Sequence, residues 1–154
     1  MSAEAKLKEL GIELREVPTG DRPLVPSVLT GNLLFLSGNG PNPNKDGKTW
    51  NGQVGKEYTA EEGYEAARCV ALNLLSAART ALGSPDRVRR VVKVLGMVNS
   101  APGFSGQPQV INGCSDLLVQ VFGQNGRHAR SAVGMAGLPG NIPVEIEMIL
   151  EVEA

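Results

Sequence analysis

Long hydrophobic runs are missing from this chain of 154 residues. No apolar segment reaches the roughly 18 residues that a membrane-spanning helix requires. Residues 1–6 also lack the apolar core of a secretion signal. We therefore expect a cytoplasmic protein that has no membrane partner.

Histidine, cysteine and aromatic residues are scarce. The chain has one histidine, His128, two cysteines, Cys69 and Cys114, and an aromatic share of 4%. Two cysteines on predicted helices do not form a disulfide framework, and one histidine with two distant cysteines does not supply a zinc site. The glycines near residue 40 do not form a dinucleotide loop, because Pro41 and Pro43 lack the amide donors that a phosphate needs. We predict neither a metal nor a cofactor.

An excess of charge of either sign is also missing. The 15 basic and 16 acidic residues leave a net charge of −1, which gives no electrostatic attraction to nucleic acid or to an anionic membrane. The one basic cluster, within residues 87–93, alternates with valines and is typical of the solvent-facing side of a strand. Nucleic acid is therefore not an expected partner.

Hydrophobic periodicity predicts an α+β fold. A capping box at Thr59 and Glu62 marks the start of a long helix that Gly83 ends. The predicted helices are 3–10, 59–82 and 108–122. The predicted strands are 12–17, 28–29, 33–38, 88–98, 130–136 and 143–153. This order predicts one domain, 1–154, in which two helices pack on one face of a mixed β-sheet.

The segment 39–56 is rich in Gly, Asn and Pro and contains the single tryptophan, Trp50. We predict a long loop with a short strand near residues 53–55. Loops of this length inside compact domains are often functional, but they can also be purely structural. The sequence leaves both interpretations open.

The strongest functional signal lies in residues 126–147. Arg130 begins a strand of small residues, and its planar guanidinium suits bidentate binding of a carboxylate. Glu145 lies on the following strand, where it could orient a water molecule or move a proton. We predict that the two side chains face each other across two strands and grip a small carboxylic acid. A solvated strand end, or a plain salt bridge between them, is the alternative.

His128, just before Arg130, has two interpretations. It could act as a general base near neutral pH, or it could be a structural residue of the turn. A serine nucleophile elbow is not present, because residues 103–106 do not match G-x-S-x-G.

Three segments resemble the RidA/YjgF family, the reactive-imine deaminases. The C-terminal signature is RSAV at 130–133, LP at 138–139 and VEIE at 144–147. The strand GNLLFLSG at 31–38 and Asn112 on the last predicted helix also agree with the family pattern. NGCSD at 112–116 and GRHAR at 126–130 resemble a separate subgroup, whose members are often labelled endoribonucleases.

The resemblance implies a chorismate-mutase-like fold and a homotrimer with ligand clefts between adjacent subunits. It implies that Arg130 holds the substrate carboxylate and that Glu145 positions the hydrolytic water. The further substrate-binding residues that it implies are Ser37, Gly38, Asn112, Ser131 and Ala132. The implied reaction converts enamines or imines derived from amino acids into 2-keto acids and ammonia without a cofactor.

Two positions depart from the deaminase pattern. Leu24 stands where that branch has a tyrosine, and Ala132 stands where it has a cysteine. Three hypotheses therefore remain open. The chain could be an enamine/imine deaminase, a trimer that binds a 2-keto acid without turnover, or an endoribonuclease that inhibits translation.

Overall fold

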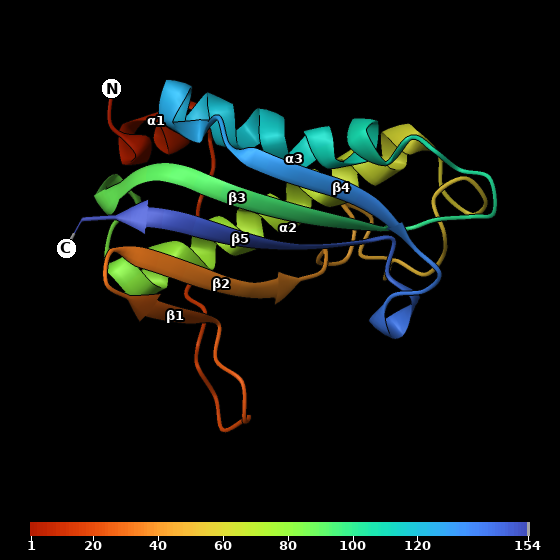
Figure 1. Cartoon of the computed structure of the whole chain (residues 1–154), viewed down its shortest axis with the longest axis horizontal. Helices are drawn as coiled ribbons and strands as arrows, with labels where there is room; N and C mark the ends of the chain where they lie inside the picture. The colour runs from red at the N-terminus through yellow and green to blue at the C-terminus, as the bar shows by residue number, and fades with distance from the viewer. Residues whose placement is uncertain (154) are drawn as a thin grey trace.

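A five-stranded mixed sheet forms the centre of the computed structural model, which describes residues 1–153 (Figure 1). The strands are β1 (Ser27–Thr30), β2 (Leu33–Asn39), β3 (Val88–Asn99), β4 (Ala129–Met135) and β5 (Val144–Val152). They lie in the order β1-β2-β5-β3-β4. Only β3 and β4 pair in parallel within the described chain, and the other neighbours are antiparallel.

Two long helices cover one face of this sheet, as Figure 1 shows. The helices are α1 (Ala3–Glu9), α2 (Ala60–Leu82) and α3 (Gln107–Phe122). Short 3-10 turns lie at Pro85–Arg87, Gly123–Gly126 and Pro139–Asn141. The predicted α+β fold, with two helices on one face of a mixed sheet, is confirmed. No helix of the described residues is long and apolar enough to cross a membrane.

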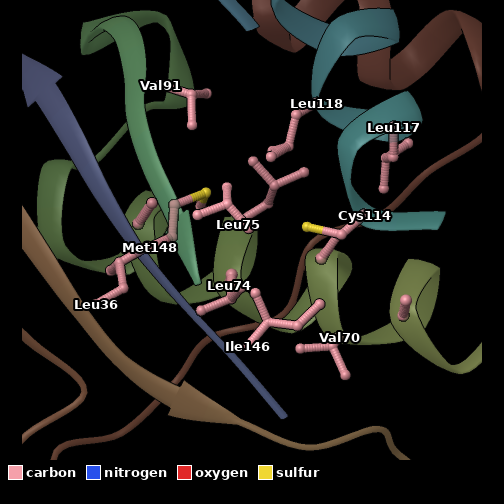
Figure 2. Packing of buried hydrophobic residues seen from close by; sticks show 14 of the residues in the cluster. Leu36, Val70, Leu74, Leu75, Val91, Cys114, Leu117, Leu118, Ile146 and Met148 are labelled. Atoms are coloured by element: carbon pink, nitrogen blue, oxygen red, sulfur yellow. The ribbon is translucent and has the colours of Figure 1, made fainter. Parts of the chain in front are cut away.

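The core fills the space between the sheet and the two helices (Figure 2). Alternate residues of β5 point towards the helices, and Ile146 and Met148 lie against Leu74 and Leu75 of α2. Cys114 of α3 is fully buried in the same cluster. Within residues 1–153 no helix lies over the opposite face of the sheet, so the residues that alternate with the core remain accessible there.

The prediction of a strand at 12–17 is wrong. This segment runs along α2, and two of its backbone N–H groups donate to hydroxyl groups of that helix. Arg15 N–H donates to Ser76 Oγ at 3.3 Å, and Val17 N–H donates to Thr80 Oγ1 at 3.0 Å. The apolar residues alternate because one side of the segment packs on the core. Such packing does not require a neighbouring strand. The partly buried side chains that pack against the core are Ile12, Leu14 and Val17.

The long loop 39–56 is anchored to the rest of the molecule. Trp50 is 9% exposed, its Nε1–H donates to the carbonyl of Asn42 at 2.9 Å, and its ring lies edge-on to Tyr58. The short strand predicted near 53–55 is reduced to isolated bridges made by Val54. Trp50 is therefore a packing residue that anchors the loop.

The capping box at the start of α2 gives a first testable prediction. Thr59 Oγ1 accepts a hydrogen bond from Glu62 N–H at 3.1 Å, and Glu62 Oε2 accepts one from Thr59 N–H at 2.8 Å. We expect Thr59→Ala to lower the free energy of unfolding by about 1 kcal/mol, because the Glu62 N–H at the start of the helix loses its acceptor. Urea denaturation measures this change. Thr59→Ser keeps the hydroxyl and should stay close to the native value; equal losses in both variants would contradict the role of the cap.

Candidate functional site

Arg130 points towards the helix-covered face of the sheet from the edge strand β4. Its register partner on β3 is Val94, whose side chain is fully buried beneath the helices. Arg130 is only partly buried, because β4 lies at the margin of the sheet. The guanidinium therefore sits between the sheet edge and α3.

Two side chains of α3 hold one nitrogen of this guanidinium. Arg130 Nη1 donates to Asn112 Oδ1 at 2.7 Å and to Ser115 Oγ at 3.1 Å. Asn112 and Ser115 are three residues apart, so they share one face of the helix. Within residues 1–153, neither Nε nor Nη2 of Arg130 has a hydrogen-bond partner. The Nε–Nη2 edge can therefore donate hydrogen bonds to both oxygens of a ligand carboxylate.

His128 extends this hydrogen-bonded group. Its Nε2 lies 2.9 Å from Ser115 Oγ, and its Nδ1 lies 2.7 Å from the carbonyl oxygen of Gly126. Burial lowers the pKa of His128, the Gly126 carbonyl opposes this shift, and the charge of Arg130 lowers the pKa further. Both ring nitrogens are engaged inside the protein, so the geometry favours the structural interpretation of His128 over that of a free general base.

The thiol beside this group is inert. Burial raises the pKa of Cys114 to about 12, and the positive charge of Arg130 opposes this shift only in part. A thiol with such a pKa is protonated at neutral pH and is a poor nucleophile. In residues 1–153 no group of three or more His, Cys, Asp or Glu side chains could hold a metal ion.

Glu145 lies on the opposite, uncovered face of the sheet. Its neighbours on β5, Val144 and Ile146, are fully buried on the helix side, so the carboxylate points away from the helices. It lies directly over Gly38 of β2, where an added Cβ would come within 2.9 Å of Glu145 Oε2. A side chain at position 38 would therefore displace the carboxylate. Gly38 lies beside Glu145, as a shared site for these two residues requires.

A single chain does not bring Arg130 and Glu145 together. The strand β3 lies between β4 and β5, and the register partner of Glu145 across β3 is Met97, which in turn pairs with Val133. The two side chains thus lie on opposite faces and on strands that are not neighbours. The expectation that they face each other across two strands is wrong for one chain, because neither the order of the strands nor the covered face is visible in the alternation of residues.

The other candidate residues divide between the two faces. Ala132 pairs with Gly96 and packs against the core on the face of Arg130. Ser131 pairs with Leu95 on the uncovered face, where its Oγ accepts a hydrogen bond from Lys93 Nζ at 3.4 Å.

Ser37 and Leu24 belong to the N-terminal side of the sheet. The Ser37 hydroxyl donates to the carbonyl of Val25 at 2.6 Å and thereby holds the segment before β1. Leu24, in that segment, is 53% exposed. Because it lies at the surface, the leucine adds an apolar group there in place of a hydroxyl.

Ser115 is the residue of this site that sequence reasoning missed. It is 13 positions from His128 and 15 from Arg130, and the contacts form only when α3 packs beside β4. The one available signal was its spacing of three from Asn112 on a predicted helix, which places both side chains on one face.

The uncovered face is largely apolar around the carboxylates. Phe35 on β2 is 41% exposed and lies in register with Ile149 on β5. A hollow of about 440 Å³ opens on this face, lined in part by Phe35, Lys93, Leu95, Glu147 and Ile149. An apolar face that no helix or strand of the described residues covers is typical of a surface that contacts another protein chain.

Comparison with known proteins assigns the chain to a family. The family model described as "YjgF/chorismate mutase-like, putative endoribonuclease" matches residues 4–150. The chain belongs to the RidA/YjgF family, and its sheet with two helices on one face is the chorismate-mutase-like fold.

Individual relatives cover nearly the whole chain. Protein TCP17 of Trypanosoma cruzi is 45% identical over 148 residues, which are 96% of this chain and 92% of that protein. The crystal structure of Atu1372 from Agrobacterium tumefaciens, whose function is unknown, matches at 42% identity with a TM-score of 0.86, covering 99% of this chain and 93% of that chain. A "putative endoribonuclease" from Shewanella oneidensis matches at 31% identity with a TM-score of 0.89, covering 99% and 100%.

Proposed function

We propose that this protein is a small-molecule deaminase that hydrolyses 2-imino acids, and their enamine tautomers, to 2-keto acids and ammonia. The observation that carries the proposal is the hydrogen bonding of the Arg130 guanidinium. Its Nη1 is held by two side chains of α3, while its Nε–Nη2 edge has no partner in the described chain. A fixed arginine with one open edge is suited to a bidentate carboxylate.

The site is completed by a second copy of the chain, in a homotrimer. Arg130 and Glu145 lie on opposite faces of one sheet, so they meet only if the Glu145 face of one subunit approaches the β4 edge of its neighbour. The apolar uncovered face around Phe35 and Ile149 supports such packing. In a closed ring of three subunits, each interface then contributes one site.

The chemistry needs only these two groups and water. Arg130 holds the carboxylate of the imino acid and keeps its C2 carbon beside Glu145. Glu145 accepts a proton as the water oxygen bonds to C2, and it returns the proton to the nitrogen. The hydroxyl proton of the resulting carbinolamine then passes to the nitrogen through Glu145, the C2–N bond breaks, ammonia leaves, and C2 becomes the carbonyl of the 2-keto acid.

A binding trimer without turnover is the second candidate, and the two departures from the family pattern favour it. Leu24 brings no hydroxyl and Ala132 brings no thiol to the cleft, so a substrate or water there has two fewer polar contacts. RNA cleavage has less support than either candidate. Both nitrogens of the only histidine, His128, are engaged within the protein, and the net charge is −1.

A substitution of Glu145 tests the proposal, because this residue is needed for turnover but not for binding of the carboxylate. We expect the native protein to release pyruvate from 2-aminoacrylate generated in solution, and to bind 2-oxobutanoate. Glu145→Gln should slow pyruvate release by roughly 100-fold or more, because it removes the proton acceptor, while binding of 2-oxobutanoate is retained. Glu153→Gln, an exposed position beyond the end of β5, is the control and should leave both unchanged.

Each other outcome has a defined meaning. Binding of 2-oxobutanoate without any pyruvate release above the buffer rate would establish the binding trimer and overturn the deaminase. If sedimentation gives a monomer at micromolar concentration, the intersubunit site is contradicted.

A further inference from the structure

The geometry points to Ser115 and His128 as positioning residues that orient Arg130 so that a ligand carboxylate binds side-on, through Nε and Nη2. This inference rests on the proposed function only in taking Arg130 as the carboxylate anchor. It concerns two side chains to which the deaminase chemistry assigns no role. They form a chain of hydrogen bonds from the Gly126 carbonyl to the guanidinium.

Each proton in this chain can be assigned. The Gly126 carbonyl can only accept, so His128 Nδ1 carries a hydrogen. In the neutral imidazole Nε2 is then an acceptor, and the Ser115 hydroxyl donates to it. The Ser115 oxygen is thereby turned so that a lone pair meets Arg130 Nη1–H.

The consequence for the guanidinium is geometric. Nη1 has two hydrogens, and Asn112 and Ser115 take one each. A carboxylate that binds end-on needs a hydrogen from both Nη1 and Nη2. Because Nη1 has none left, the remaining bidentate mode uses Nε and Nη2. Asn112 alone would leave the second Nη1 hydrogen available and the guanidinium free to rotate between the two modes.

The charges around His128 favour the neutral form on which this assignment depends. From β4, which begins directly after His128, Arg130 is the charge that acts on the imidazole. From α3, Cys114 is uncharged at neutral pH, and the Asp116 carboxylate accepts a hydrogen bond from Tyr64 of α2. From β3, Lys93 lies on the other face of the sheet, beside Ser131.

The first experiment observes the chain of hydrogen bonds without any ligand. Because the protein has one histidine, its imidazole signals in heteronuclear NMR belong to His128. We expect the Nδ1–H tautomer and a pKa below the ordinary 6.5, which rises in Arg130→Gln when the neighbouring positive charge is removed. Observation of the Nε2–H tautomer would overturn the inference.

The second experiment measures binding of 2-oxobutanoate, with folding and oligomeric state checked for each variant. We expect Ser115→Ala and His128→Ala each to raise the Kd by roughly 10-fold, because Arg130 loses one of its two supports. His128→Gln offers Ser115 an amide oxygen as acceptor and should recover most of the affinity. In turnover of 2-aminoacrylate the loss should appear in KM, with kcat within about twofold, because Glu145 is untouched.

The two proposals fail in different ways. If the native protein does not bind 2-oxobutanoate, the proposed function fails, and the tautomer and its response to Arg130→Gln still test the positioning chain. If Arg130→Gln loses binding while Ser115→Ala and His128→Ala bind as the native protein does, Asn112 alone orients the arginine and the inference is overturned.

Discussion

Replacing Arg130 by glutamine is expected to weaken binding of 2-oxobutanoate by about 100-fold or more, and to reduce 2-aminoacrylate turnover at least as much. Glutamine has no charge and no two-pronged donor edge for the carboxylate. Truncating one partner of a hydrogen-bonded charge pair costs roughly 2–5 kcal/mol, which corresponds to such a loss.

Two further variants test whether the loss of binding is specific to the guanidinium of Arg130. Arg130→Lys keeps the charge but loses the planar fork, so we expect intermediate binding. Arg127→Gln removes an exposed arginine only three residues away and should bind as the native protein does. Equal losses in Arg127→Gln and Arg130→Gln would mean that the effect is one of general surface charge, which would contradict a built carboxylate site. Isothermal titration with 2-oxobutanoate measures all three.

Co-assembly of two inactive variants tests whether Arg130 and Glu145 act from different subunits. In a trimer of mixed Arg130→Gln and Glu145→Gln chains, a site is intact when each of its two subunits contributes its unaltered residue. Random assembly produces this combination at about a quarter of the sites, so about a quarter of the native activity should return. If both residues acted within one chain, every mixed site would stay defective and no activity would return.

Gly113→Ala is expected to destabilise the protein by about 2 kcal/mol or more. A Cβ at this position of α3 would overlap the carbonyl oxygen of Tyr64 and lie 2.9 Å from its carbonyl carbon, both backbone atoms of α2. The helices must move apart to accommodate it, and overpacking of this kind costs typically 1–3 kcal/mol and occasionally more. The sign is opposite to that in an exposed helix, where the same change stabilises by about 1 kcal/mol.

The free energy of unfolding, measured by urea denaturation, checks this expectation. Gly137→Ala is the matched control: this glycine is exposed, has no left-handed backbone and has open space where the Cβ would be. Its unfolding free energy should stay within about 0.5 kcal/mol of the native value. A Gly113→Ala protein as stable as the native one would contradict the close backbone approach of α2 and α3.

Much of the architecture could be predicted from local patterns. The capping box of Thr59 and Glu62 and the glycine at position 83 placed both ends of α2. The alternation along residues 144–152 predicted β5 and its buried side. These predictions are confirmed because caps and periodicity act over a few residues, within the reach of a sequence pattern.

The segment 12–17 shows what a local sequence pattern does not predict. Its alternation is real, since one side packs on the core, but the N–H groups of Arg15 and Val17 bond to hydroxyls of α2 instead of to a neighbouring strand. A pattern of burial does not say which acceptor a backbone donor will find, because that depends on what lies beside the chain in space.

The same distinction between local pattern and tertiary packing applies to the candidate site. The sequence by itself determined the chemical groups: an arginine suited to a carboxylate, a glutamate that can accept a proton, and an asparagine on the last helix. Only the tertiary structure decided their relations. The order of the strands puts β3 between β4 and β5, the helices cover the face of Arg130, and Ser115 meets His128 across elements. The physical reason is that side-chain identity is local, whereas the distance between two side chains depends on packing, which brings together residues that are far apart along the chain.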